Sequence, residues 1–165
     1  MEAAVNQDQL LKRLDVRWQE FRAAFAGLSD EAVLTPGVTG AWSARDLMSH
    51  VATWDEEALK ALPMVLEDKP LPRYASIGGI DSFNAREQWR KRGMNLDEVA
   101  RDMETTHRRL LSFLRTVSPA AYASEGRFVK RLRLDSYGHY RKHAAGVLSM
   151  AKVARPMRLT VNGVE

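Results

Sequence analysis

Residues 41–54, AWSARDLMSHVATW, decide the fold class because they join a helix start to an apolar stripe. Ser43 can accept a hydrogen bond from the backbone N–H near Asp46 while the Asp46 side chain reaches back, which is a capping box. Beyond the cap, apolar side chains recur with the three-and-four spacing of an amphipathic helix, at Leu47, Val51, Trp54, Ala58 and Leu62. Pro63 is expected to kink this helix or to begin its end. The stretch therefore predicts a long helix that buries one face.

Three other segments carry the same helical pattern. They are expected at about residues 6–26, at residues 95–117 behind an Asn95 cap, and from residue 135 or 136 to the stop at Arg155-Pro156. Residues 120–134 fit no single element. Because no alternation of strands and helices appears, the chain predicts an all-α four-helix bundle.

The connections are read from turn-forming residues. Ser29 can cap a short turn through Val33, and Pro36-Gly37 with Gly40 then predict a loop. The longest irregular piece runs from residue 68 to 79, between the second and third long helices, and is followed by helical signals at residues 82–87. A connection of that length often carries function.

Composition bounds the class of protein. At 165 residues the chain predicts one domain, with the bundle over residues 1–156 and a C-terminal tail over 157–165. No cysteine is present, which excludes disulfides, thiolate ligands and a cysteine nucleophile, so any thiol must come with a cosubstrate. No secretory signal is recognisable at the N-terminus, and the most apolar segment, residues 47–66, is interrupted by charges that exclude a membrane span. A cytoplasmic location is expected.

The net charge of +4 raises the question of nucleic-acid binding. Basic residues gather between residues 127 and 142, but elsewhere Lys and Arg alternate with Asp and Glu, and no recognised binding motif appears. A solvated basic face is the favoured interpretation.

Histidines supply the candidate chemistry. His139 and His143 lie four residues apart in YGHYRKH, residues 137–143, so one helix face can present both rings to one cation. His50 lies on the apolar stripe of the second helix, so three imidazoles could converge inside the bundle. The alternative is that each ring is an interior residue with its own hydrogen-bond partner. Burying three imidazoles without metal needs three sets of partners, which favours a metal site. Imidazole ligands suit Zn(II) or Ni(II).

Three segments together resemble the DinB-like superfamily of four-helix bundles, most closely the ClbS/DfsB type. They are residues 41–54, SFNARE at 82–87 and YGHYRKHA at 137–144. The resemblance implies an up-up-down-down bundle, often dimeric, with a divalent metal held by His50, His139 and His143. Members include thiol-dependent transferases and isomerases, metal-dependent hydrolases, and a hydrolase that protects its host from a genotoxin. Nucleic-acid binding is not implied.

Other side chains are weaker candidates for the site. His107 could be a core histidine, which is favoured, or an outer or fourth ligand; Asp46 could orient His50, but capping is its simpler role. Candidates for the pocket lining, beside tryptophans 42 and 54 that are expected in the core, are Asn84, Arg86, His107, Tyr137 and Tyr140. Asn84 and Arg86 could equally begin an exposed helix. No catalytic residue is assigned.

The predicted function is a metal-binding protein that acts on a small electrophilic molecule, either as a thiol-dependent transferase or as a hydrolase. Two alternatives stay open: a non-catalytic or metal-free bundle that binds a small molecule for self-protection, and a metal-free bundle that binds another protein. The expected partners are a small molecule and a second copy of the chain, with neither nucleic acid nor membrane.

Overall fold

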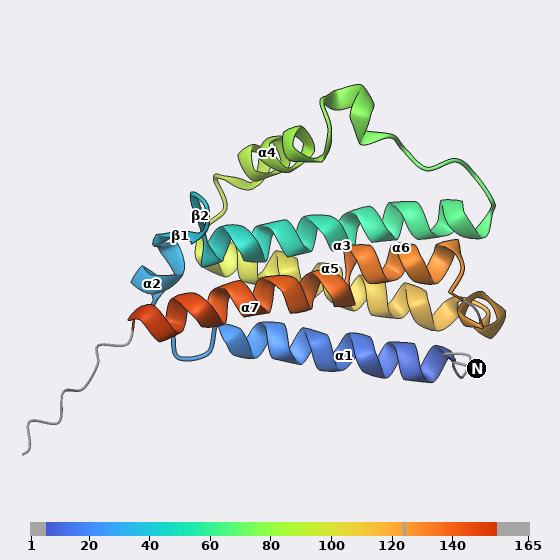
Figure 1. The fold of residues 1–165 in the computed structure, drawn as a ribbon, viewed down its shortest axis with the longest axis horizontal. Helices are drawn as coiled ribbons and strands as arrows, with labels where there is room; N and C mark the ends of the chain where they lie inside the picture. Colours follow the sequence, from blue (N-terminus) through green and yellow to red (C-terminus); the bar gives the residue numbers. More distant parts are fainter. Residues whose placement is uncertain (1–5, 124, 155–165) are drawn as a thin grey trace, which may run out of the picture.

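A computed structural model describes residues 6–123 and 125–154 of the chain. Four long helical segments form a bundle (Figure 1). They are α1 (Gln7–Ala24), α3 (Ala44–Leu66), α5 (Leu96–Thr116), and a fourth segment made of α6 (Arg127–Asp135) and α7 (Tyr137–Ala154). The predicted all-α four-helix bundle, with a long connection between the second and third helices, is confirmed. The predicted tail over residues 157–165 and the stop at 155–156 lie outside the described residues.

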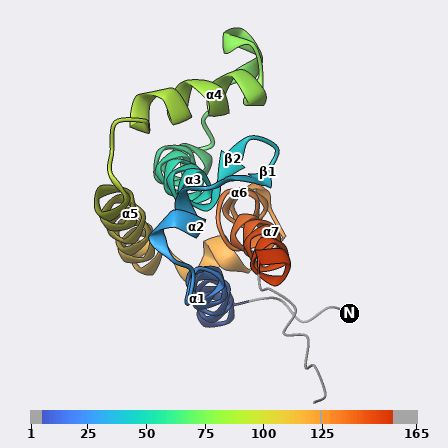
Figure 2. The same ribbon diagram turned by 90° about the vertical axis from the view of Figure 1, so that its left-hand side faces the viewer.

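The helix directions follow from that long connection. Figure 1 shows that α1 and the α6–α7 segment run one way along the bundle, while α3 and α5 run the other way. The order along the chain is therefore up-down-down-up. This is the up-up-down-down order that the resemblance implies, begun one helix later. Residues 67–95 carry the chain back over the length of the bundle, which makes α3 and α5 parallel. In the end-on view of Figure 2, α4 (Ile80–Lys91) lies outside the bundle, beyond α3.

Local capping sets the helix starts. The Asp46 backbone N–H donates to Ser43 Oγ at 3.2 Å, and the Ser43 N–H donates to Asp46 Oδ2 at 3.0 Å. Asn6 and Asn95 cap α1 and α5 in the same way. Pro63 lies within the last turn of α3, which ends at Leu66. The capping residues predicted at Ser43 and Asn95 are thus confirmed.

Short elements join the first two long helices. Ser29 caps α2 (Asp30–Leu34), as predicted. Next, β1 (Pro36–Thr39) pairs antiparallel with β2 (Trp42–Ser43), where the sequence predicted only a loop. Gly37 has a φ of 109°, a left-handed region that glycine adopts without steric cost. Because β1 packs against α7, the hairpin brings Trp42 to the space between α3 and α7.

The fourth helical segment begins within the stretch that fitted no single element. A 3₁₀ turn (Pro119–Tyr122) precedes α6, and the helix then breaks at Ser136, whose φ and ψ are −125° and −99°. Tyr137 restarts it, close to the predicted start of the final helix. A Cβ on Gly138 would lie 2.7 Å from the Arg133 carbonyl oxygen, so glycine permits the close approach at this break.

Two buried cations hold α4 against the bundle. Lys91 Nζ donates to Glu56 Oε1 of α3 and to Asp102 Oδ2 of α5, both at 2.7 Å. Arg45 Nη2 donates to the carbonyl oxygens of Lys91 at 2.8 Å and Met94 at 2.6 Å, so it binds the C-terminal end of α4. These contacts fix α4 beside the first half of α3.

A buried polar cluster lies in the core between α3, α5 and α7. Both carboxylate oxygens of Asp55 lie within hydrogen-bond distance of Tyr140 Oη, at 2.6 and 2.7 Å. His107 Nδ1 lies 3.1 Å from the same hydroxyl, and its ring stacks on Trp18 with centroids 3.8 Å apart. All these side chains are buried. None of the described helices has the length and apolarity needed to cross a membrane.

Replacing Tyr140 with Phe should lower the free energy of unfolding by roughly 2–3 kcal/mol, because the buried Asp55 carboxyl group and His107 both lose their hydrogen-bond partner. Tyr122→Phe is the matched control, since its hydroxyl donates to the neutral carbonyl of Leu114 at 2.7 Å. That change should cost about 1 kcal/mol. Urea unfolding measures both values, and equal losses would contradict the special role of Asp55.

Candidate functional site

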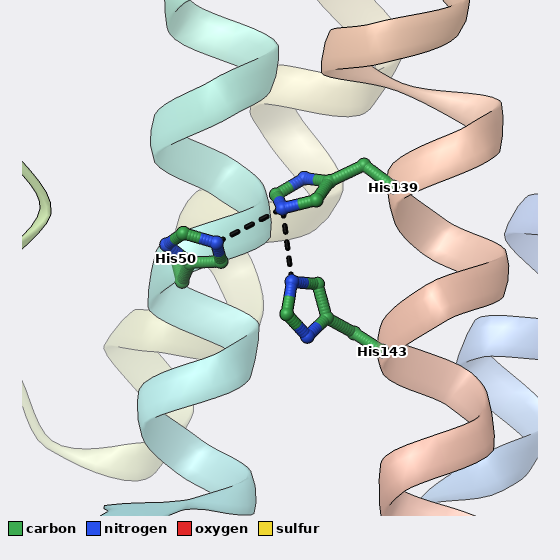
Figure 3. A group of neighbouring side chains, drawn as sticks. All are labelled: His50, His139 and His143. Carbon is green, nitrogen blue, oxygen red and sulfur yellow. Dashed lines mark hydrogen bonds between the residues drawn. The ribbon is translucent and has the colours of Figure 1, made fainter. Parts of the chain in front are cut away.

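Three histidines meet between α3 and α7. His50 comes from α3, and His139 and His143 come from successive turns of α7 (Figure 3). His139 Nε2 lies 2.9 Å from His50 Nε2 and 2.9 Å from His143 Nε2. One nitrogen from each ring fits within a group whose members are at most 4.8 Å apart. The structure therefore brings together the three residues singled out from the sequence.

The two contacts of His139 cannot both be good hydrogen bonds. A neutral imidazole nitrogen carries either one hydrogen or one lone pair, so it makes one well-directed hydrogen bond at a time. His139 Nε2 nevertheless has two nitrogen neighbours at 2.9 Å. A cation between the rings would accept a lone pair from each Nε2 and would account for both close contacts.

Burial keeps these rings neutral. It lowers the pKa of His139 to about 2, with further lowering by the charges of His143 and His50. Burial, followed by the charges of His143 and Lys142, lowers the pKa of His50 to about 3. The pKa of His143 falls to about 4 through burial and the charge of Lys142. Unprotonated imidazole is the form that binds metal.

Two tryptophans pack against the histidine rings. The ring centroids of Trp42 and His50 lie 4.8 Å apart, and those of Trp54 and His139 lie 6.0 Å apart. Nδ1 of His139 is buried and has no hydrogen-bond partner among the described residues. Asp46, considered as an orienting carboxylate for His50, instead completes the cap of α3.

A cavity of about 390 Å³ opens beside the histidines. Besides the three rings, its lining comes from the hairpin, α3, α4 and the α6–α7 segment: Thr39, Trp42, Trp54, Ile80, Asp81, Asn84, Leu134 and Lys142. The two tryptophans, expected in the core, thus border the site. The sequence held a signal for Trp54, since it lies one helical turn after His50. Trp42 had none, because the hairpin that places it was not predicted.

The weaker candidates separate into three locations. Asn84 lies in the cavity lining, where its Oδ1 accepts from Trp54 Nε1 at 3.1 Å. Arg86 lines a different cavity, of about 330 Å³. His107 and Tyr140 lie in the core around Asp55, which is the location favoured for His107. Tyr137 is also buried, and its hydroxyl has no partner among the described residues.

Three solved structures share this fold. ClbS, a colibactin self-resistance protein crystallised in complex with a dsDNA, is 10% identical, with a TM-score of 0.77 over 92% of this chain and 98% of its own. DfsB, described as a sibling lethal factor precursor, is 14% identical, with a TM-score of 0.76 over 91% and 97%. An uncharacterised protein from Escherichia coli UTI89 is 12% identical, with a TM-score of 0.73 over 93% and 96%. Comparison with curated proteins finds no match.

The ClbS structure corrects one prediction. Its dsDNA overturns the expectation that nucleic acid is excluded as a partner, which rested on the lack of a recognised motif. Phosphate contacts need only exposed basic side chains, so a bundle can bind DNA without such a motif. The predicted homodimer and cytoplasmic location are untested by these comparisons and stay predictions.

Family membership rests on the sequence as well as on the fold. The model of the DinB superfamily matches residues 13–146, which include all three histidines of the site. The likeness to ClbS and DfsB agrees with the type that the sequence resembles. The chain belongs to the DinB superfamily.

Proposed function

We propose that the chain binds one divalent metal ion, zinc or nickel, through Nε2 of His50, His139 and His143. The observation that carries the proposal is the pair of 2.9 Å contacts made by a single nitrogen of His139. Zn–N bonds of about 2.0–2.1 Å would place tetrahedral ligand nitrogens roughly 3.3 Å apart, close to this spacing. Three neutral nitrogen donors also suit the imidazole preference of zinc and nickel.

We infer that the bound metal serves chemistry on a small electrophilic molecule in the adjoining cavity. A divalent ion held by neutral ligands polarises a carbonyl and lowers the pKa of a coordinated water or thiol. The chain's own residues bind and orient: Trp42 and Trp54 pack against the ligand rings, and the cavity beside them has room for a substrate. Either hydrolysis or transfer of a thiol fits this arrangement. Because the chain has no cysteine, the thiol would belong to a cosubstrate.

Metal content tests the ligand set. Protein purified without an affinity tag and offered Zn(II) should hold about one equivalent by inductively coupled plasma mass spectrometry, as a single site requires. His50→Ala and His139→Ala should each hold less than about a tenth of that, because two imidazoles bind zinc weakly.

His107→Gln is the matched control for loss of a histidine, since His107 lies in the core polar cluster and outside the metal group. It should retain the metal, with folding checked by circular dichroism. Equal zinc in wild type and both ligand variants would refute the proposed site.

The neutral rings also predict how stability depends on pH. The unfolded chain takes up protons near pH 6.5, whereas the folded rings resist them until about pH 4 or below, so metal-free protein loses stability as pH falls. Asp135 has the opposite effect on stability. Burial raises its pKa to about 7, so the folded state takes up this proton at a higher pH than the unfolded state and gains stability as the pH falls. The test is therefore a difference between wild type and His139→Gln, in which the contribution of Asp135 cancels.

As the pH falls from 6 to 4.5, the metal-free wild type should lose about 1 kcal/mol more unfolding free energy per pH unit than His139→Gln does. Urea unfolding of metal-free protein at several pH values measures this slope. Tyr122→Phe is the control that destabilises without altering the slope, since burial raises the pKa of Tyr122 to about 12. An unchanged slope in His139→Gln would mean that the ring is already protonated in the folded protein.

A second proposal is that the basic face of α6 and α7 binds double-stranded DNA. Lys130, Arg133, Arg141 and Lys142 are all exposed along these two helices. The DNA-bound structure of ClbS supports this proposal through the shared fold. Binding through phosphates would be independent of base sequence and sensitive to salt.

Reversing two of these charges, Lys130→Glu with Arg141→Glu, should weaken duplex binding at least about 10-fold at 50 mM salt. Arg101→Glu with Arg108→Glu is the matched control, because it makes the same change in net charge on exposed positions of α5. Fluorescence anisotropy with a labelled 20-base-pair duplex measures both affinities. Equal weakening by the two pairs would point to net charge alone and would reject this face as the DNA site.

A further inference from the structure

Apolar side chains that are open to solvent border the cavity beside the histidines. Ile80 and Leu134 line it while 51% and 67% exposed, and half-buried Trp42 lies next to His50. Large exposed apolar side chains around a concave site are usually covered by a ligand. These side chains therefore suit an apolar body such as an aromatic ring system.

Asn84 presents hydrogen-bond donors from the same cavity. The indole N–H of Trp54 can only donate, so the Asn84 atom 3.1 Å away must be the amide oxygen. This contact determines the orientation of the amide and leaves Nδ2 with two N–H groups. Nδ2 has no acceptor among the described residues. An acceptor on the ligand would satisfy it.

Two charged side chains complete the lining. Lys142 of α7 and Asp81 of α4 both border the cavity and are exposed, and they form no ion pair in the described part of the chain. Lys142 Nζ adds donors from α7, whereas Asn84 belongs to α4. The negative charge of Asp81, in the first turn of α4, would repel a negative ligand. Asp81 is well solvated, so its repulsion is weak. Donors from two helices favour a ligand group rich in acceptors.

We propose that this cavity binds an aromatic carboxylate. Its ring would cover Trp42, Ile80 and Leu134, and its carboxylate would accept from Asn84 Nδ2 and Lys142 Nζ. Charge-assisted hydrogen bonds of this kind are about twice as strong as neutral ones, so they would select an acid over a neutral analogue. The inference rests on the proposed function for the choice of site and names its ligand class.

The test compares 2-naphthylacetate with 2-(2-naphthyl)ethanol, which shares the ring and lacks the carboxylate. Isothermal titration calorimetry is run on the whole chain, once metal-free after dialysis against EDTA and once loaded with zinc. The metal-free wild type should bind the acid at least about 10-fold more tightly than the alcohol.

Two variants remove the donors, each with a control of equal charge change. Asn84→Asp keeps an acceptor for Trp54 but loses both N–H groups, and Lys142→Gln loses the positive charge. Each should reduce the preference for the acid at least about 5-fold. Arg86→Gln and Arg141→Gln change the net charge equally from outside the cavity lining and should leave the preference intact. Asp81→Asn should tighten binding of the acid by about 2-fold.

Equal binding of the two probes, binding of neither, or a preference that survives both donor variants would overturn the inference. A preference seen only with zinc, and unaffected by Asn84→Asp and Lys142→Gln, would also overturn it while leaving the metal site standing. If the chain fails to take up zinc but the metal-free protein still prefers the acid to the alcohol, the inference is supported and the metal proposal is rejected.

Discussion

The buried carboxylate of Asp55 is the constraint on which the bundle depends. Burial raises the pKa of Asp55, and a buried carboxyl group needs hydrogen-bond partners nearby. The hydroxyl of Tyr140 lies 2.6 and 2.7 Å from its two oxygens. Asp55 lies on α3 a little beyond His50, and Tyr140 follows His139 on α7. The interaction that satisfies the carboxylate therefore also sets the register of α7 on α3. That register determines where His139 and His143 meet His50.

The elements outside the bundle turn this meeting point into a cavity. The hairpin contributes Trp42, and α4 contributes Ile80 and Asn84. Both elements are anchored by side chains at the start of α3: Ser43 belongs to the hairpin and caps the helix, and Arg45 binds the carbonyl groups at the end of α4. One end of the bundle thus positions the histidines and the walls around them together.

Likeness to ClbS and DfsB extends over nearly the whole chain but at low identity, so it establishes the fold and leaves the chemistry to the site. Here the site joins three neutral imidazoles to apolar side chains and to the donors of Asn84 and Lys142, which have no acceptor among the described residues. Such a combination can hold a cation and, beside it, an amphipathic molecule. The exposed basic side chains of α6 and α7 are a separate feature, because only Lys142 also borders the cavity.

The sequence by itself determined whatever depends on neighbours along the chain. Ser43 and Asn95 begin their helices through local capping bonds, and the four-residue spacing of His139 and His143 puts both rings on one helix face. What only the tertiary structure decided depends on contacts between distant segments. His50 meets His139 across 89 residues, Trp42 reaches the site through a hairpin, and Tyr140 faces Asp55 in place of the cavity. Periodicity places a residue on a helix, but packing between helices decides which partner its side chain finds.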